Sequence, residues 1–200
     1  LRCKTIFFKL ISKFLPLLRL FPPETSHSLS MVALKSLSYF YFREPTPIVS
    51  DDIELLGLKF SNRVGLAAGM DKNADYIEPL SLLGFGFLEL GTLTPKAQTG
   101  NFKPRLFRLT KEKSLINRMG FNNKGIDHAV KKIKKSNVKA VIGLSIGKNF
   151  DTSLDKAVED YLFCMERAYP VCDYIAVNIS SPNTKDLRKL ESEKYFSNLI

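Results

Sequence analysis

The chain has 200 residues, of which 44% are hydrophobic and 11% are aromatic. This composition excludes a disordered or collagen-like protein and provides enough apolar side chains for the core of one domain, or of part of one. The three cysteines, Cys3, Cys164 and Cys172, lack the spacing of a metal site, which favours a reducing compartment.

The formal net charge of +10 is concentrated at the N-terminus. Residues 1–43 contain seven basic residues and one acidic residue, Glu24, so +6 of the charge lies in the first fifth of the chain. The remaining +4 is spread over a mixed surface and does not require a nucleic-acid-binding face. The sequence pI of about 9.5 keeps such a face open as a hypothesis.

Residues 5–21 combine Phe, Leu and Ile with Lys9, Lys13 and Arg19. A spanning helix needs about 20 mostly uncharged apolar residues, so this segment is expected to lie in a membrane interface. A second helix is predicted after Pro22-Pro23 and continues to about residue 42. We therefore predict a membrane-facing helical module at 1–43. A signal or transit peptide, or a docked helical pair, is the alternative.

Beyond Pro45, short apolar runs alternate with longer helical patterns. Strands are predicted at 63–68, 86–91, 140–144 and 173–177, and helices at 74–83, 125–136 and 154–169. This alternation predicts an α/β fold with a parallel sheet that is buried on both faces.

Small or polar residues follow each of the four predicted strands, at 69–72, 92–95, 145–149 and 178–184. In a parallel βα array, ligands bind beyond the carboxyl ends of the strands. A single polar tail would be an ordinary turn, whereas four of them indicate a ligand site at one edge of the sheet.

The residue types in these segments restrict the chemistry. The sequence has no P-loop and no dinucleotide fingerprint. Its two histidines are His27 and His128, and His128 is predicted to be a solvated residue of a Lys-rich helix. The amides of Asn117, Asn178 and Asn183 complement a planar imide ring, and oxidation of such a ring needs an external electron acceptor, most naturally a flavin.

Six ordered motifs carry a resemblance to a known family. They are GLAAGMDK (65–72), GFGFLELGTLTP (84–95), KPRLFRL (103–109), INRMGFNNKG (116–125), IGKN (146–149) and AVNISSPNT (176–184). Together they resemble the dihydroorotate dehydrogenases, and specifically class 2, the membrane-associated, quinone-dependent branch. The match extends from about Phe14 to the last residue.

The resemblance implies a (β/α)8 TIM barrel that contains FMN, with about the first four βα units present in residues 44–200 after an N-terminal helical pair. It implies oxidation of (S)-dihydroorotate to orotate in de novo pyrimidine synthesis, with a membrane quinone as the final electron acceptor. It also implies peripheral association with the bacterial inner membrane, on its cytoplasmic side, or with the mitochondrial inner membrane, and no nucleic-acid partner.

The resemblance also assigns site residues. The residues expected at the flavin are Ala68, Gly69, Met70, Asp71, Lys72, Thr92, Ser145 and Asn178. Those expected at the substrate are Lys72, Asn117, Arg118, Met119, Gly120, Phe121, Asn178 and Asn183. Arg108 resembles the arginine near the quinone head group.

Ser181 resembles the catalytic base that distinguishes class 2, since class 1 enzymes use a cysteine there and lack the N-terminal helices. A serine is a poor base in water and needs a desolvated, hydrogen-bonded setting. Thr184 and nearby waters are candidate helpers. Strand alternation is expected to point the neighbouring Ser180 the other way.

The chain departs from the family pattern in two ways. Ser145 stands where the family usually has an asparagine that contacts the flavin, so this contact is in doubt unless a water bridges the gap. A complete barrel runs to about 250 residues, so residues 1–200 are expected to be a fragment that neither binds FMN tightly nor turns over alone.

Two rival functions remain from the sequence. A tRNA dihydrouridine synthase is also an FMN barrel and would explain the basic pI, but that family uses a cysteine base and the six motifs do not fit it. A non-catalytic membrane-binding remnant would use only the helical module.

Overall fold

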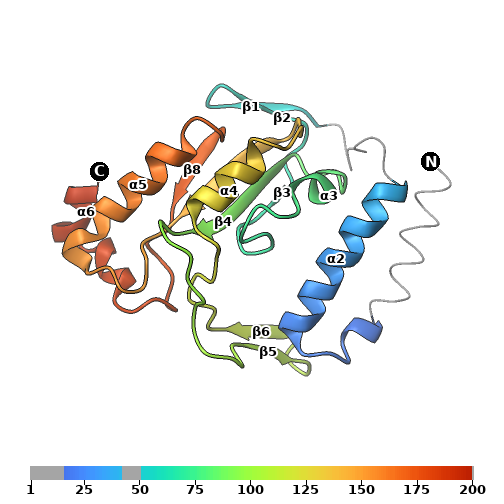
Figure 1. Cartoon of the computed structure of the whole chain (residues 1–200), viewed down its shortest axis with the longest axis horizontal. Coiled ribbons are helices and arrows are strands. Elements are labelled where there is room, and N and C mark those ends of the chain that lie inside the picture. Colours follow the sequence, from blue (N-terminus) through green and yellow to red (C-terminus); the bar gives the residue numbers. More distant parts are fainter. Residues whose placement is uncertain (1–15, 42–50, 200) are drawn as a thin grey trace. The chain divides into compact units, whose positions relative to one another are not determined.

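The computed structural model describes residues 16–41 and 51–199. These residues form two compact units (Figure 1). One unit contains the N-terminal helical segment together with residues 103–117, and the other contains residues 51–102 and 118–199. Most of the predicted helix at 5–21 lies outside the described residues. No helix in the part that the structure describes is long and apolar enough to cross a membrane.

The helical unit is built around α2, Pro23–Tyr41. Pro23 occupies the first helical position and Glu24 lies in the first turn, where a fixed φ and a negative charge both favour a helix start. The unit also contains an antiparallel hairpin of β5, Leu106–Leu109, and β6, Ser114–Asn117. The sequence did not predict this hairpin, because its strands are only four residues long and one of them is interrupted by charge.

The second unit is built on a four-stranded parallel sheet with the order β3-β4-β7-β8. The strands are β3, Gly65–Leu66; β4, Phe87–Leu93; β7, Val141–Ile146; and β8, Tyr174–Val177. The predicted parallel sheet is therefore confirmed. β3 is shorter than predicted at both ends. At its start, the Val64 N–H donates to the Asn62 side chain at 2.9 Å instead of to a neighbouring strand.

The two central strands form the core of the sheet. All six residues of β7 are buried, and Leu88, Leu90 and Leu93 of β4 are fully buried. Burying a leucine side chain contributes roughly 1.5–3 kcal/mol, so β4 and β7 fix the position of everything at their carboxyl ends. The edge strand β8 is only partly buried.

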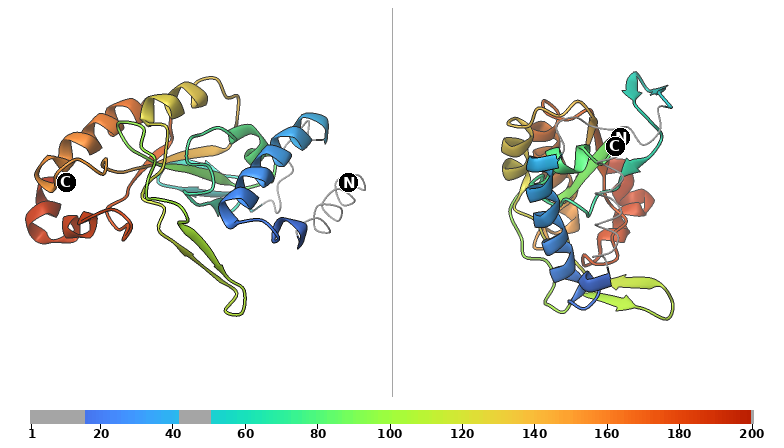
Figure 2. Two further views of the ribbon diagram at one scale, coloured as in Figure 1. Left: turned by 60° about the horizontal axis from the view of Figure 1, so that its bottom comes forward. Right: turned by 90° about the vertical axis from the view of Figure 1, so that its right-hand side faces the viewer.

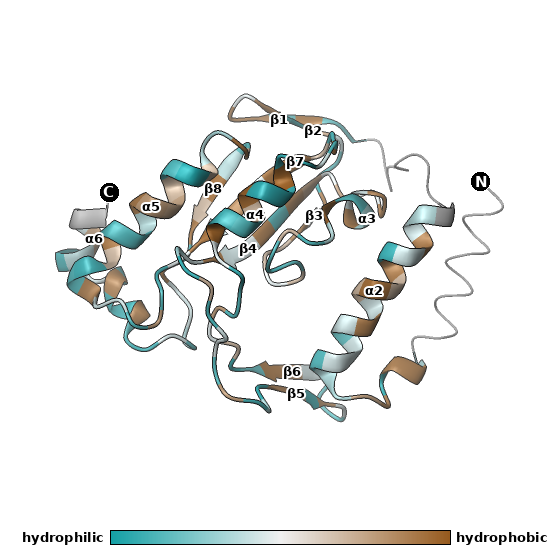
Figure 3. Cartoon of the chain, in the orientation of Figure 1, coloured by the Kyte–Doolittle hydropathy of each residue, from teal (hydrophilic) through white to brown (hydrophobic). Residues whose placement is uncertain are grey.

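Two helices cover one face of this sheet (Figures 1 and 2). They are α4, Ile126–Ile133, and α5, Ala157–Ala168, which follows a short 3-10 turn, η1, at Leu154–Lys156. α4 buries Ile126, Ala129 and Ile133, a helical spacing, and carries hydrophilic residues on the outer side (Figure 3). α3, Ile77–Ser81, begins later than predicted because Ala74 has a left-handed φ of 58°.

Four further elements complete the unit. β1, Ile53–Leu55, and β2, Leu58–Phe60, form an antiparallel hairpin. Its two turn residues, Leu56 and Gly57, both have positive φ, as this type of two-residue turn requires. The chain ends in a 3-10 helix, η2, at Leu187–Glu191, and in α6, Glu193–Leu199.

Candidate functional site

Backbone hydrogen bonds bring the four predicted polar segments to one edge of the sheet. The Gly69 N–H donates to Gly91 O at 2.8 Å, which joins the first segment to the end of β4. The Gly147 N–H donates to Leu93 O at 2.8 Å, and the Asn178 N–H donates to Ile146 O at 2.9 Å. The segments that follow β3, β4, β7 and β8 therefore lie side by side. We call this edge the rim.

Three side chains from different strands form a hydrogen-bonded row at the rim. Asn178 Nδ2 donates to Thr92 Oγ1 at 2.9 Å, and Thr92 Oγ1 lies 2.9 Å from Ser145 Oγ. Thr92 and Ser145 are 8% and 2% exposed. The row thus connects a half-buried amide to a buried pair of hydroxyls.

Asn178 is held in place by more than Thr92. Its Oδ1 accepts the Ser180 N–H at 3.3 Å, and its backbone carbonyl accepts the Tyr161 hydroxyl of α5 at 2.9 Å. Burial raises the pKa of the Tyr161 phenol well above its ordinary value, so this group is a permanent donor at neutral pH. Tyr161 was not among the residues predicted from the sequence, because it carries no motif and simply occupies the buried face of a helix.

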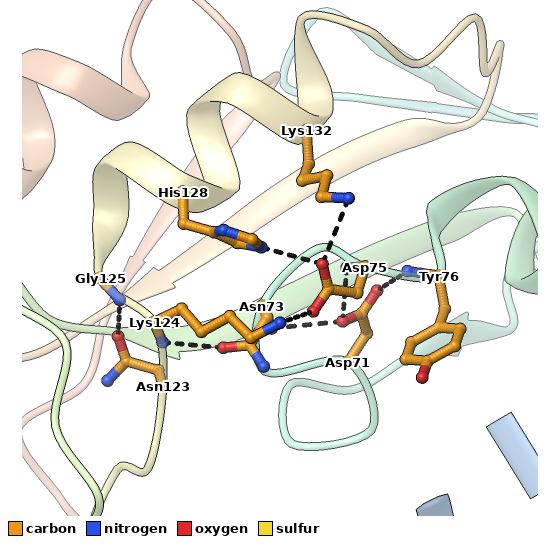
Figure 4. A network of polar contacts seen from close by, with 9 residues as sticks. All are labelled: Asp71, Asn73, Asp75, Tyr76, Asn123, Lys124, Gly125, His128 and Lys132. Carbon is orange, nitrogen blue, oxygen red and sulfur yellow. Dashed lines mark hydrogen bonds and ion pairs between the residues drawn. The ribbon is translucent and has the colours of Figure 1, made fainter. Parts of the chain in front are cut away.

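The loop that carries Lys72 is organised around Asp71 (Figure 4). The Asp71 carboxylate accepts the backbone N–H groups of Asn73, Asp75 and Tyr76 at 3.2, 3.0 and 2.7 Å. Burial raises the pKa of Asp71, although these hydrogen bonds oppose the rise. Lys72 Nζ donates to Gly69 O at 2.6 Å. Asp71, expected at the flavin, therefore uses its side chain to shape the loop.

A charged cluster fastens the same loop to α4 (Figure 4). Asp75 contacts Lys124 Nζ at 2.8 Å, His128 Nε2 at 2.9 Å and Lys132 Nζ at 3.6 Å. Burial favours a higher pKa for Asp75, but the hydrogen bonds and charges of Lys124 and His128 outweigh it and hold the pKa below its usual value. His128, predicted to be solvated, is instead half-buried and pairs with Asp75.

The 118–121 segment is joined to the last rim segment by Asn101. Asn101 Nδ2 donates to Arg118 O at 2.9 Å and to Asn183 O at 3.1 Å, and the Asn101 N–H donates to Met119 O at 3.0 Å. A Cβ on Gly120 would approach the Asn101 side chain within 2.9 Å, so only glycine allows this packing. The sequence analysis did not identify Asn101.

A half-buried amide, Gln98, and a buried one, Asn123, support the same segment. Gln98 Nε2 donates to Gly120 O at 3.1 Å, and Asn123 Nδ2 donates to Phe121 O at 2.7 Å. The structure thus gathers the backbone of the predicted substrate residues Arg118, Met119, Gly120 and Phe121 next to Asn183.

Ser181 lies half-buried in the rim segment that follows β8, whereas Ser180 is exposed. The Asn183 N–H points to Ser181 Oγ at 3.3 Å, and a donor in this position favours the negatively charged form of the hydroxyl. Thr184 is 3% exposed, and its Oγ1 has no hydrogen-bond partner among the described residues.

The remaining predicted residues are placed as follows. Ala68 and Gly69 are half-buried and Met70 is exposed at the rim. Asn117 and Arg108 belong to the helical unit, so their places at the substrate and the quinone stay predictions. Arg108 Nη1 donates to Arg19 O at 3.0 Å and to Phe21 O at 3.3 Å, and so anchors the chain just before α2.

The helical unit contains one strong ion pair that the sequence analysis missed. Arg105, 6% exposed, contacts Glu24 Oε1 at 2.6 Å and Oε2 at 3.3 Å. The Arg105 hydrogen bond, opposed by burial and aided by the charges of Arg105 and Lys103, lowers the pKa of Glu24. Glu24 and Arg105 also line a cavity of about 470 Å³ in this unit.

The donor set at the rim suits a flat ring that is rich in hydrogen-bond acceptors. It offers the Lys72 ammonium, the amide of Asn178 and the hydroxyl of Thr92, which the buried Ser145 hydroxyl holds. A Cβ built on Gly69 would meet nothing within 4 Å, so the backbone there faces open space into which a ring can pack. A parallel α/β sheet with such a rim defines a class of small-molecule-binding α/β proteins.

Comparison with known proteins defines the family. The family model for dihydroorotate dehydrogenase matches residues 52–200, and the chain belongs to the dihydroorotate dehydrogenase family. The match supports this family over a dihydrouridine synthase.

Individual relatives agree with this result. The chain is 49% identical over 188 residues to "Dihydroorotate dehydrogenase (quinone)" of Aromatoleum aromaticum, covering 92% of this chain and 53% of that protein. It is 51% identical over 197 residues to the protein of the same name from Buchnera aphidicola, covering 98% and 58%. A solved structure from Eimeria tenella, described as DHODH in complex with ferulenol, aligns with a TM-score of 0.78 at 38% identity and covers 90% of this chain and 50% of that one. The chain therefore spans about half the length of these relatives.

Proposed function

We propose that this chain provides the first part of a dihydroorotate dehydrogenase that oxidises (S)-dihydroorotate to orotate and passes the electrons through FMN to a membrane quinone. The observation that carries the proposal is the rim, where Ser181, the Thr92–Ser145–Asn178 row and the Lys72 loop converge on one edge of a parallel sheet. The names of the curated relatives agree with this activity.

The residues that would hold FMN are those at the ends of β3, β4, β7 and β8. When bound, the flavin supplies the hydride acceptor that amino-acid side chains lack. Gly69 and its neighbours Ala68 and Met70 offer backbone and open space, and Lys72 offers a positive charge. The side chains of Asp71 and Ser145 already have protein partners. These two residues are therefore proposed to act on the flavin indirectly, through the groups that they hold.

Residues around the last rim segment would bind the substrate. The amides of Asn178 and Asn183 complement the alternating carbonyl and N–H groups of the dihydroorotate ring. Asn117, which belongs to the helical unit, stays a proposed substrate residue on the family resemblance alone. The backbone of 118–121, fastened by Asn101 and Gln98, would seat the carboxylate. These contacts orient the ring so that its C5 faces Ser181.

Ser181 is proposed to take the proton from ring carbon C5. Its hydroxyl is a weak base in water, so its reactivity depends on a setting that excludes water and stabilises the oxyanion. The Asn183 N–H at 3.3 Å supplies one such contact. The buried hydroxyl of Thr184 is a candidate for carrying the proton outward.

The test is a Ser181→Ala variant in a full-length enzyme that contains residues 1–200. Loss of a general base slows proton transfer about 10²–10⁴-fold, so anaerobic flavin reduction by dihydroorotate should slow by this factor while FMN stays bound. Ser180→Ala removes the exposed neighbouring hydroxyl and is expected to retain most of the rate. An undiminished rate in Ser181→Ala would contradict the proposal.

We also propose that the helical unit gives quinone access to the flavin and attaches the protein peripherally to a bacterial inner membrane or a mitochondrial inner membrane. The basic charge of residues 1–43 suits an anionic membrane surface. Arg108, on β5 in the same unit as α2, is the proposed contact for the quinone head group.

The activity is proposed to require more chain than these residues. The sheet ends in two edge strands, β3 and β8, and β8 is only partly buried, unlike the central strands. A (β/α)8 barrel would continue the sheet from both edges and bury them. We therefore regard these strands as part of the first half of such a barrel.

A further inference from the structure

The structure gives Ser145 a role that its place in the sequence does not suggest. Ser145 stands where the family pattern has a flavin-contacting asparagine, yet its hydroxyl lies 2.9 Å from Thr92 Oγ1 and the residue is 2% exposed. The backbones of β4 and β7 approach closely at this point. A Cβ built on Gly91 would lie only 2.5 Å from Ser145 O. The shorter side chain is therefore turned to the neighbouring strand.

The number of protons on the two hydroxyls determines what this contact does. Each hydroxyl has one proton and accepts up to two hydrogen bonds. Asn178 Nδ2 donates to Thr92 Oγ1, so the bond between the two hydroxyls uses one of their two protons. The other proton has no acceptor among the residues that the structure describes.

Burial decides which hydroxyl keeps the spare proton. If Thr92 donated to Ser145, the unused proton would belong to the more enclosed hydroxyl, and a buried donor without an acceptor is unfavourable. If Ser145 donates, Thr92 Oγ1 accepts from both Ser145 and Asn178. The spare proton then belongs to Thr92, the more exposed of the two residues and the one in direct contact with the rim amide.

We propose that Ser145 is a positioning residue that donates to Thr92 and thereby makes Thr92 a hydrogen-bond donor to an acceptor atom of the flat ring bound at the rim. This inference rests on the proposed function, in which that ring is the flavin. A donor at this place favours the electron-rich, reduced form of a flavin. Ser145 thus replaces the amide of the family pattern by acting through its neighbour.

The experiment is a double-mutant cycle in a full-length, FMN-loaded enzyme that contains residues 1–200. Ser145→Ala, Thr92→Val and the double variant are compared for FMN dissociation constant, flavin reduction potential and rate of reduction by dihydroorotate. The loss of one hydrogen bond is expected to weaken FMN binding about three- to tenfold and to lower the reduction potential. In the Thr92→Val background, Ser145→Ala should have no further effect, because its partner is already gone.

Two variants control for folding. Ser81→Ala removes another buried hydroxyl, which bonds locally to Glu78 O in α3, and should leave both the dissociation constant and the potential unchanged. Ser145→Cys keeps the size but is only a weak donor, so it should fall between Ser145→Ala and the unmodified enzyme.

The outcomes separate this inference from the proposed function. If the unmodified enzyme does not bind FMN, or its flavin is not reduced by dihydroorotate, the proposed function fails. If it passes both tests, then additive effects of Ser145→Ala and Thr92→Val show that Ser145 contacts the flavin directly and overturn the inference. A Ser145→Ala or Ser145→Cys enzyme that matches the unmodified one also overturns it.

Discussion

Individual residues outside the rim determine the geometry of the residues at the rim. Tyr161 is an example, because it is buried in α5 and its hydroxyl is bonded to the backbone carbonyl of Asn178. Asn178 is thereby held at two points: Tyr161 bonds to its backbone carbonyl and Thr92 bonds to its side-chain amide. In the proposed mechanism, a small error in this position would misplace the substrate ring against Ser181.

Replacement of Tyr161 by phenylalanine tests this function. Tyr161→Phe keeps the packed ring and removes one hydrogen bond, so it should lower the free energy of unfolding by about 1 kcal/mol. It should also raise KM for dihydroorotate several-fold, with a smaller change in kcat, because Asn178 is a proposed substrate contact. Steady-state kinetics and chemical denaturation give the two values.

The control for this variant is Tyr169→Phe, since Tyr169 is 79% exposed at the end of the same helix. A Tyr161→Phe enzyme with a normal KM would show that the hydroxyl supports folding alone.

At the scale of elements, the ion pair between Glu24 and Arg105 joins the first turn of α2 to the start of β5. Glu24 lies in the first turn of α2, where its negative charge also interacts favourably with the helix dipole. The hydrogen bond from Arg105 is the largest influence on the lowered pKa of Glu24, followed by opposing burial and by the charges of Arg105 and Lys103. One carboxylate therefore links two elements that are far apart in the sequence.

Stability of the helical unit should depend on pH through Glu24. Because the folded pKa lies below the unfolded value, the stabilisation is fully present above the ordinary pKa of about 4.5. It is lost as pH falls through the lowered folded pKa. Glu24→Gln should destabilise this unit by about 1–3 kcal/mol at neutral pH, because the nearly buried Arg105 loses its charged partner.

Limited proteolysis of the 103–117 hairpin, measured from neutral pH into the acid range, monitors this effect. Glu24→Gln should be cleaved faster at neutral pH and show less acid dependence than the unmodified protein. Glu112→Gln changes an exposed acid of the same hairpin and serves as the control. Equal acid dependence of the Glu24→Gln and unmodified proteins would contradict the prediction.

At the scale of the whole molecule, the two units are proposed to divide the reaction between them. In this proposal, the rim would serve the half-reaction with dihydroorotate, and the helical unit would serve electron transfer to the quinone. Because β3 and β8 are edges of the sheet, the first half-reaction is also expected to need the rest of a barrel. Residues 1–200 alone should bind FMN weakly and show no dihydroorotate oxidation.

Deletion of residues 1–42 from a full-length enzyme tests the division of labour. Anaerobic flavin reduction by dihydroorotate should be retained, since the rim lies in the other unit. Reduction of a long-chain quinone in vesicles should be abolished, because the proposed access route and membrane contact are removed. A small, water-soluble electron acceptor is the control and should still be reduced. Equal losses in the two half-reactions would contradict the prediction.

Much of the fold was predictable from the sequence because it is locally encoded. The apolar runs that became β4, β7 and β8 are short, continuous and bounded by polar segments, and this pattern predicts buried parallel strands wherever it occurs. The hairpin of β5 and β6 was not predicted, because its pattern is short and mixed. Its formation depends on contacts within the helical unit.

The rim could be anticipated, but its internal connections could not. Chain order alone places the segments after Leu66, Leu93, Ile146 and Val177 at the same edge of a parallel sheet. Nothing local indicates that Asn101 would bond to the backbone of Asn183, or that Ser145 would face Thr92 rather than a ligand.

The sequence by itself therefore determined the α/β class, the four polar segments and the residue types available for chemistry, because hydrophobic periodicity and strand order are properties of neighbouring residues. Only the tertiary structure decided which hydroxyl meets which amide and which acid meets which base. Those pairs join positions that are 86 residues apart for Thr92 and Asn178 and 81 apart for Glu24 and Arg105. Such contacts exist only when packing of the whole chain brings the elements together.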